Sequence, residues 1–532
     1  MRIRVAAYIA LAAGTSWFGA TIAARQQASR IDFASRPTSS IRYLKASNAG
    51  EDDRLGRGDP LVGVGMAMSA DGNTLAVSSP HEDGGATGVN GNQKDESAWD
   101  AGAVYVFVRS GGRWTQQAYI KASNAQTSDR FGISVALSGD GNTLAVGATL
   151  EDSGARGVGA NQGDNSADSA GAVYVFARTG TTWAQQAYIK ASNADAADQF
   201  GWSLALSNDG NTLAVGAQGE GSAATGINPP SPAGSGGTGG GQEDNSAADA
   251  GAAYVFVRTG AMWTQQAYIK ASNAQGGDRF GFSITLTADG NTLAVGAYDE
   301  DGGASGINGV VNEDAPGSGA AYVFVRRGTT WTQDAYVKQT TTVRNSALGS
   351  AVALSADGTT LAVGAVDETS LTRGIDGDEN SKQDNTVSAG AIYIYGRTAD
   401  GWRRQAYVKS FNIGPTDLFG MRLALTRDGS VLAAGAPGQS GSGRGFKANP
   451  EELKAPESGA VYLFVRNAGR WTQQAYIKAP NADEFDQFGS GVALSADGAT
   501  MAVAANGEDS GSGIDGNQND NSLRDSGAVF IF

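Results

Sequence analysis

The stretch FGISVALSGDGNTLAVGA, residues 131–148, decides the fold because close variants of it recur along the chain. Its Ile133, Val135 and Leu137 alternate with small residues, which is the period of a strand with one buried face. A second apolar run, residues 143–148, follows Asp140-Gly141, and Asp-Gly is the pair most typical of a tight hairpin turn. The stretch therefore predicts two antiparallel strands joined by a turn.

The Asp-Gly pair of this stretch recurs in seven equivalent places at a nearly constant period. The turns lie at Asp71, Asp140, Asp209, Asp289, Asp357, Asp428 and Asp497. All intervals measure 68 to 71 residues except one of 80, which contains a Pro- and Gly-rich insertion at 228–241. Each copy adds an apolar run such as residues 171–178 and a more polar run such as residues 183–192. A fixed period of this kind indicates a repeat architecture with four strands in each copy.

Seven such copies predict an all-β fold, a single seven-bladed β-propeller with four antiparallel strands per blade. The chain ends with GAVFIF (527–532), a third strand with no fourth strand after it. The segment IRYLKASNA (41–49) matches the fourth strands of the other copies. We therefore predict that the N-terminal strand joins the C-terminal blade and closes the ring, so that the propeller spans residues 41–532.

The first 40 residues have the features of an export signal. MRIR is followed by an uncharged, Ala-rich run over residues 5–23 and by small residues at 21–24. We predict a signal peptide at 1–24 and a linker at 25–40, with an uncleaved membrane anchor as the alternative. The mature protein is then extracellular, on the cell surface or in the periplasm.

Composition excludes several classes of function. A net charge of -15 and a pI near 4.6 argue against nucleic acid or an anionic membrane as partner. The chain has no cysteine and one histidine, His81, so disulfides, thiolate metal sites and His-based triads are absent. His81 lies next to Glu82 without a nucleophile beside it in the sequence. We predict that the protein is not an enzyme.

The two ends of the opening stretch carry a family resemblance. An FG pair opens the first strand at Phe131, Phe200, Phe280, Phe419 and Phe488, and is replaced by Leu348-Gly349 in the fifth copy and Val62-Gly63 in the first. Gly147-Ala148 closes the second strand, and the full GAP occurs at Gly435-Ala436-Pro437. The unit resembles FG-GAP repeats, the blades of the integrin α-subunit propeller, and is most similar to exported bacterial proteins built from them. The resemblance implies a binding scaffold for cell-surface adhesion or protein–protein contact.

In that family, some blades bind calcium through Asp-x-Asp/Asn-x-Asp-Gly-x-x-Asp. Here the pattern falls on Ala136, Ser138, Asp140 and Leu144, so only one carboxylate is present and a turn is the better interpretation. The long loops after the second strand share one face with the loops after the fourth strand, which we call the long-loop face. Their carboxylates and amides would suit Ca²⁺, although Asp and Asn also brace their own loops. Candidate ligands are Glu151, Asp152, Asp164, Asp83, Asp95, Asp301, Asp509 and Asp520.

Aromatic residues and one tripeptide complete the list of candidates. Tryptophan recurs at the start of the outer strand, which indicates packing between blades, at Trp114, Trp183, Trp263, Trp331, Trp402 and Trp471. Trp202 and Trp99 break the repeat and are better candidates for stacking on a ligand, and Arg57-Gly58-Asp59 spells a tripeptide that some integrins recognise. We predict a monomer that binds a protein or polysaccharide on the long-loop face. A carbohydrate-binding or polysaccharide-acting protein with its site at the propeller mouth is the alternative.

Overall fold

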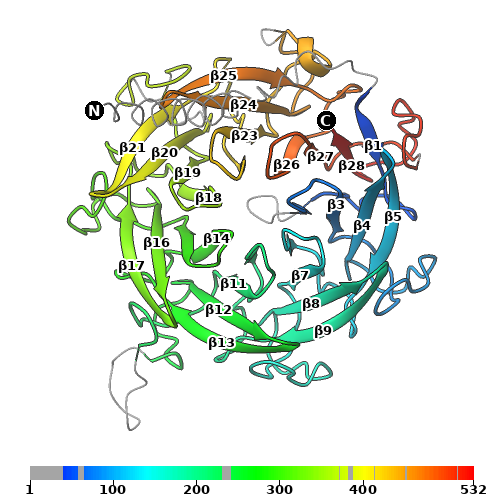
Figure 1. Ribbon diagram of the computed structural model, residues 1–532, viewed down its shortest axis with the longest axis horizontal. Helices are drawn as coiled ribbons and strands as arrows, with labels where there is room; N and C mark the ends of the chain where they lie inside the picture. The colour runs from blue at the N-terminus through cyan, green and yellow to red at the C-terminus, as the bar shows by residue number, and fades with distance from the viewer. Residues whose placement is uncertain are drawn as a thin grey trace, which may run out of the picture. The chain divides into compact units, whose positions relative to one another are not determined.

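The computed structural model describes residues 40–57, 65–229, 241–370, 372–381, 388–412, 414–449, 452–511 and 513–532. These residues form seven four-stranded antiparallel sheets arranged as a ring around a central axis (Figure 1). The predicted fold class is therefore confirmed. The predicted signal peptide, all but the last residue of the predicted linker, and Gly58, Asp59, Val62 and Gly63 lie outside the described residues.

Blades 1 to 6 each run in sequence order from the axis to the rim. Blade 1 consists of β2 (Met66–Met68), β3 (Thr74–Ser79), β4 (Ala103–Ser110) and β5 (Arg113–Ile120). Blade 2 consists of β6 (Ser134–Leu137), β7 (Thr143–Ala148), β8 (Ala172–Thr179) and β9 (Thr182–Ile189). Blade 3 consists of β10 (Ser203–Leu206), β11 (Thr212–Ala217), β12 (Ala252–Thr259) and β13 (Met262–Ile269). Blade 4 consists of β14 (Phe280–Leu286), β15 (Thr292–Ala297), β16 (Ala320–Arg327) and β17 (Thr330–Val337). Blade 5 consists of β18 (Leu348–Leu354), β19 (Thr360–Ala365), β20 (Ala391–Thr398) and β21 (Gly401–Val408). Blade 6 consists of β22 (Arg422–Leu425), β23 (Val431–Ala436), β24 (Ala460–Asn467) and β25 (Arg470–Ile477). A 3-10 helix, Gly445–Lys447, lies in the long loop of blade 6.

Blade 7 takes its strands from both ends of the described chain. Its inner three strands are β26 (Phe488–Leu494), β27 (Met501–Ala505) and β28 (Ala528–Ile531), and its outer strand is β1 (Arg42–Leu44). β1 pairs antiparallel with β28, with Tyr43 opposite Phe530 and Leu44 opposite Val529. Because β1 covers the outer edge of β28, the last sheet has the same four-stranded form as the others.

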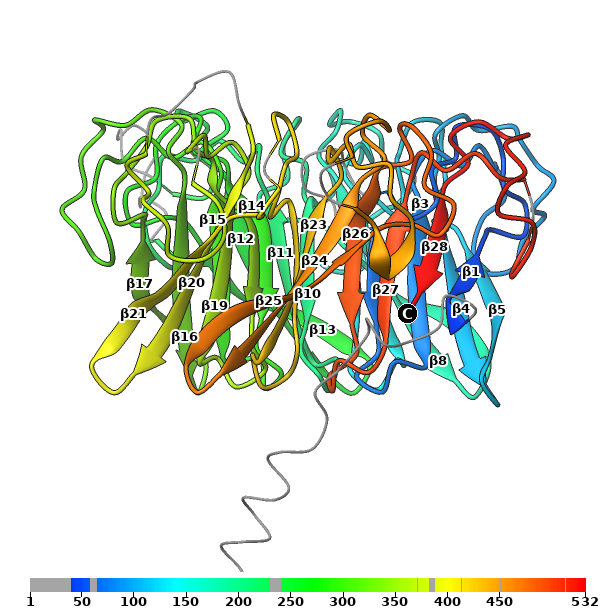
Figure 2. The same cartoon turned by 90° about the horizontal axis from the view of Figure 1, so that it is seen from above.

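The two faces of the ring differ in the length of their connections. Figure 2 shows the long loops, such as the one between β7 and β8, gathered on one side and the short turns on the other. Asp140 forms one of those short turns: its Oδ1 accepts hydrogen bonds from the Ser138 hydroxyl at 2.5 Å and the Asn142 backbone N–H at 2.9 Å. Although burial alone would raise it, these hydrogen bonds hold the pKa of Asp140 below its ordinary value. The prediction that Asp140-Gly141 is a turn is confirmed.

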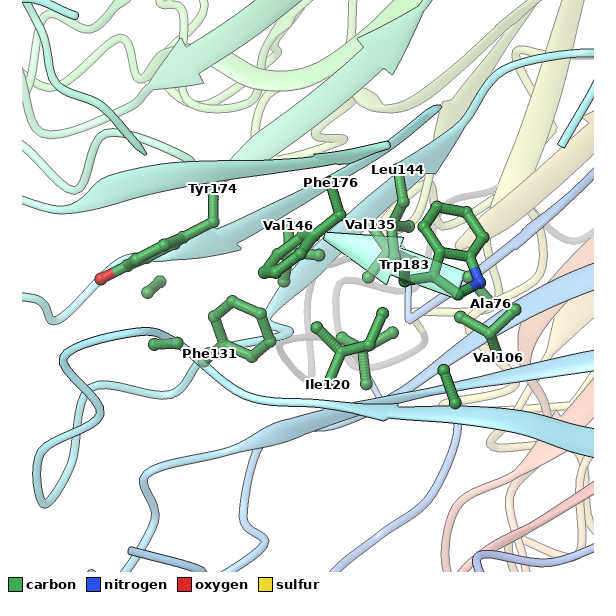
Figure 3. Packing of buried hydrophobic residues seen from close by; sticks show 14 of the residues in the cluster. Ala76, Val106, Ile120, Phe131, Val135, Leu144, Val146, Tyr174, Phe176 and Trp183 are labelled. Atoms are coloured by element: carbon green, nitrogen blue, oxygen red, sulfur yellow. The ribbon is translucent and has the colours of Figure 1, made fainter. Parts of the chain in front are cut away.

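The core lies between neighbouring blades. One cluster joins Val106 and Ile120 of blade 1 to Leu144, Tyr174 and Phe176 of blade 2, with Phe131 packed between them (Figure 3). The ring of Phe131 meets that of Tyr174 edge-on, with centroids 5.3 Å apart. A side chain on Gly102 would come within 2.2 Å of the Phe131 carbonyl, so glycine is required where the blades approach. The FG pair is thus a packing element between blades.

The structure corrects the position of this pair in the first copy. The Leu55 N–H donates to the Ser526 carbonyl at 3.0 Å, as the Phe131 N–H donates to the Ala101 carbonyl. The Gly56 N–H donates to the Ser78 carbonyl, as the Gly132 N–H donates to the Gly147 carbonyl. Leu55-Gly56 therefore takes the place that the sequence assigned to Val62-Gly63. The repeated motif was visible as DRLG at 53–56 and DRFG at 129–132.

Candidate functional site

The predicted calcium ligand Glu151 is buried and bound to a lysine. Lys190 Nζ lies 2.8 Å from Glu151 Oε2, and both side chains are buried. Tyr188 Oη and Asn124 Nδ2 donate to Glu151 Oε1 at 2.7 and 3.2 Å. Both carboxylate oxygens are thus occupied by donors from the protein, and the charge is neutralised within the fold. These contacts leave Glu151 unsuited to hold a metal ion.

The same ion pair recurs around the ring. The separations between the lysine Nζ and the glutamate Oε2 are 2.6 Å for Lys121–Glu82, 2.7 Å for Lys270–Glu220 and Lys338–Glu300, 2.6 Å for Lys409–Glu368 and 3.2 Å for Lys45–Glu508. The lysine directly follows the outer strand and is the last residue of a YIK, YVK or, after β1, YLK sequence. Sequence reasoning missed this partner, because in blades 1 to 5 it lies 38 to 50 residues beyond the acid.

Blade 6 is the exception, because glutamine replaces the glutamate. Lys478 Nζ donates to Gln439 Oε1 at 3.2 Å and to the Ser458 hydroxyl at 2.6 Å. Burial lowers the pKa of Lys478 to about 7, and Asp417 and Asp486 only partly oppose this effect. Lys478 therefore lacks the bound glutamate that opposes the effect of burial in the other six blades.

Gln439→Glu is expected to stabilise the protein by about 1–3 kcal/mol near neutral pH, because it gives Lys478 the counter-charge found in the other blades. In the unsubstituted chain the folded pKa of about 7 lies below the unfolded value, so stability rises with pH above 7 as folded Lys478 loses its proton. Gln439→Glu raises the folded pKa of Lys478, so the difference in stability between the variant and the unsubstituted chain should shrink toward pH 9. Melting temperatures across this pH range measure both effects. An equal melting temperature at pH 6 would contradict the prediction.

The second predicted carboxylate braces its own loop. Asp152 Oδ1 accepts the Ser169 backbone N–H at 2.8 Å. The equivalent contacts are Asp100 N–H to Asp83 at 2.8 Å, Gly317 N–H to Asp301 at 2.8 Å and Asp525 N–H to Asp509 at 2.7 Å. Each bond ties the start of a long loop to its end, just before the third strand. These four residues therefore have the structural role that the sequence left open as the alternative to calcium.

The remaining candidates are Asp95, Asp164 and Asp520, which lie farther out on the long loops. Asp95 Oδ1 accepts the Ser97 N–H at 3.1 Å, and Asp164 Oδ2 accepts the Ser166 hydroxyl at 3.0 Å. All three are partly exposed. Within the described ranges, no three Asp, Glu or His side chains converge on a point that could hold an ion. Calcium binding at Asp95, Asp164 and Asp520 therefore stays a prediction.

A further carboxylate stands two residues before six of the seven FG or LG pairs and is buried, whereas blade 5 has Ser346 in this position. Asp278, for example, accepts the Gln275 backbone N–H at 2.8 Å. Burial raises its pKa to about 8, and the nearby Glu300 adds to the shift. The residues in this position are Asp53, Asp129, Asp198, Asp278, Asp417 and Asp486. They shape the tight turn that leads into the FG pair.

The tryptophans divide into packing residues and one exposed residue. The Trp183 indole N–H donates to Gln117 Oε1 of blade 1 at 3.0 Å, and Arg178 stacks 5.3 Å from its ring centre. This confirms the predicted packing between blades. Trp202 is only 8% exposed and packs with Phe282. The prediction that Trp202 stacks on a ligand is therefore wrong. Trp99 is 63% exposed, as such a role requires, and Phe485, which the sequence did not single out, is 54% exposed.

The comparisons agree with this geometry. The FG-GAP repeat family matches residues 114–176, 183–229, 263–324 and 471–532. These four segments are FG-GAP repeats. Among curated proteins, none matches the chain. No helix in the described part of this FG-GAP protein is long and apolar enough to cross a membrane.

Solved structures with a similar fold are distant in sequence. The WD40 repeats of RRP9 are 8% identical with a TM-score of 0.47, covering 93% of this chain and 97% of that one. The periplasmic gluconolactonase of Pseudomonas aeruginosa is 12% identical with a TM-score of 0.43, covering 84% and 98%. A putative 6-phosphogluconolactonase from Bacteroides uniformis is 12% identical with a TM-score of 0.42, covering 79% and 86%. At this distance their activities are not transferred to the FG-GAP propeller.

Proposed function

We propose that this FG-GAP propeller is an exported binding protein that contacts a protein partner through its long-loop face. The observation that carries the proposal is the exposure of Trp99 and Phe485, which lie on loops of that face. Large aromatic side chains at the surface are typical anchors of protein interfaces. The rigid ring supplies a scaffold on which long loops can vary without disturbing the core.

The test is binding of the mature chain to immobilised extracellular-matrix proteins, measured by interferometry. The double variant Trp99→Ala, Phe485→Ala should weaken binding at least about tenfold, since interface aromatics commonly contribute 2 kcal/mol or more. Met262→Ala is the matched control, because Met262 is 72% exposed but is the first residue of β13, next to a short turn of the opposite face. Absence of binding to every probe, or equal weakening by both variants, would count against the proposal.

Calcium support forms a second part of the proposal. Because the glutamates are bound to lysines, the ligands would be Asp95, Asp164 and Asp520 with neighbouring amide and carbonyl oxygens. Sites with so few carboxylates bind Ca²⁺ in the millimolar range. Millimolar CaCl₂ should then raise the melting temperature above that in MgCl₂ at equal ionic strength, since a ligand of the folded state stabilises it. Asp164→Asn should reduce the difference, and identical melting temperatures in the two salts would reject calcium binding.

A groove beside β13 favours a polysaccharide as the second candidate ligand. Its volume is about 600 Å³, and its lining includes Ser192, Asn228, Gln242, Gln265 and Gln266. Hydroxyl and amide groups of this kind suit sugar hydroxyls. Retardation in polysaccharide-containing gels that is lost in Gln265→Ala would support this ligand over a protein.

A further inference from the structure

Five of the buried glutamates contact an asparagine as well as a lysine. In blade 3, Asn193 Nδ2 donates to Glu220 Oε1 at 2.9 Å, and Lys270 Nζ donates to Glu220 Oε2 at 2.7 Å. Asn193 follows the outer strand of blade 2, whereas Lys270 follows the outer strand of blade 3. A single carboxylate thus holds an amine and a primary amide from two neighbouring blades, and all three side chains are buried.

The carbonyl of the asparagine is also polarised. Tyr254 Oη donates a hydrogen bond to Asn193 Oδ1 at 2.7 Å. A hydroxyl in this position would stabilise the negative charge that develops on Oδ1 if a nucleophile added to Cγ. The carboxylate on the amide N–H is placed to return a proton to that nitrogen as it leaves.

The surroundings favour a nucleophilic lysine. Burial lowers the pKa of Lys270, although Glu220 opposes the shift. Desolvation makes an amine easier to deprotonate and exposes its lone pair. The set lies beside an apolar cluster that includes Phe200, Tyr254 and Tyr268, which limits competing hydrolysis by water.

We propose that these sets form amide cross-links between adjacent blades, with the lysine as nucleophile and the asparagine as electrophile. Glu220 takes one proton from the Lys270 ammonium, and Nζ forms a bond to Asn193 Cγ. Glu220 passes that proton to Nδ2 as the bond between Cγ and Nδ2 breaks, and then accepts the second proton that Nζ loses on becoming an amide nitrogen. Ammonia is the only by-product, and the step needs no oxidant or other reactant.

Four blades carry the complete set of Asn, Glu, Lys and Tyr. The other three sets are Asn48, Glu82, Lys121 and Tyr105; Asn124, Glu151, Lys190 and Tyr174; and Asn273, Glu300, Lys338 and Tyr322. The fifth asparagine, Asn481, lies 3.1 Å from Glu508, which binds Lys45, but Phe530 replaces the tyrosine. The four complete sets would link blades 7, 1, 2, 3 and 4 in a continuous covalent series.

Two blades provide internal controls. Blade 5 has the Lys409–Glu368 pair, but Thr341 occupies the position of the asparagine. Blade 6 has Asn412 and Lys478, but Gln439 replaces the glutamate. Neither blade contains nucleophile, base and electrophile together, so both lysines should remain free amines.

The test is the intact mass of the purified full chain followed by peptide mapping. We expect a mass lower than the sequence mass by four molecules of ammonia, with Asn193 and Lys270 in one branched peptide and Lys409 and Lys478 in linear peptides. Glu220→Gln should reduce the mass deficit from four molecules of ammonia to three, and Lys270 should then appear in a linear peptide. An intact mass equal to the sequence mass, with Lys121, Lys190, Lys270 and Lys338 all in linear peptides, would overturn the proposal without any variant.

Discussion

Replacing Glu368 by glutamine is expected to lower the free energy of unfolding by about 3–5 kcal/mol, the usual cost of removing one partner from a buried ion pair. Lys409 Nζ lies 2.6 Å from Glu368 Oε2, and both side chains are buried. Glutamine keeps the shape but leaves the ammonium without a counter-charge. Blade 5 is the right place for the experiment because Thr341 stands where other blades have asparagine, so no cross-link complicates the result. Chemical denaturation followed by tryptophan fluorescence measures the loss.

Two controls separate burial from charge in this experiment. Asp400→Asn breaks the exposed ion pair with Arg403 in the same blade and should leave the denaturation midpoint unchanged. The double variant Glu368→Gln, Lys409→Met removes the unpaired charge and should recover part of the lost stability. If Glu368→Gln behaved like Asp400→Asn, the ion pair would not be a main support of the blade.

The same ion pairs show where sequence reasoning stopped. The strands, the Asp-Gly turns and the packing tryptophans were predictable because each depends on neighbouring residues and recurs at a fixed period. The partner of Glu151 was not, because Lys190 comes beside it only when the outer strand returns to the long-loop face. In isolation, Glu151-Asp152 in a Gly-rich loop has the composition of a cation site. Topology supplies the lysine that neutralises it.

The error at Val62-Gly63 has a related cause. Val62 precedes Asp71 by nine residues, the same spacing as Phe131 to Asp140, so the period favoured it. Leu55 lies seven residues earlier but forms the backbone hydrogen bonds that dock the FG pair against the preceding blade. Asp53, which accepts the Gly50 N–H, marks the same turn that Asp129 forms in the second copy. Local turn chemistry located the pair better than spacing did, because an insertion changes spacing without changing the turn.

Deleting residues 1–46 is expected to prevent stable closure of the ring, whereas deleting residues 1–39 is expected to leave it intact. The longer deletion removes the buried Tyr43 and Leu44, each worth about 1.5–3 kcal/mol. It also removes Lys45 and the Tyr43 hydroxyl, which lie 3.2 and 2.8 Å from Glu508 Oε2, and an unpaired buried charge costs about 3–5 kcal/mol. The sum, about 6–11 kcal/mol, is comparable with the whole net stability of a typical protein.

Thermal unfolding and size-exclusion chromatography of the two truncated chains measure this effect. The longer deletion also leaves the outer edge of β28 without its partner, so we expect self-association through that edge. A synthetic peptide of residues 41–49 added in trans should restore the melting temperature, and the same peptide with Leu44→Asp should not, because Leu44 is fully buried against blade 1. Equal melting temperatures for the two deletions would mean that three strands of blade 7 hold the ring closed without β1.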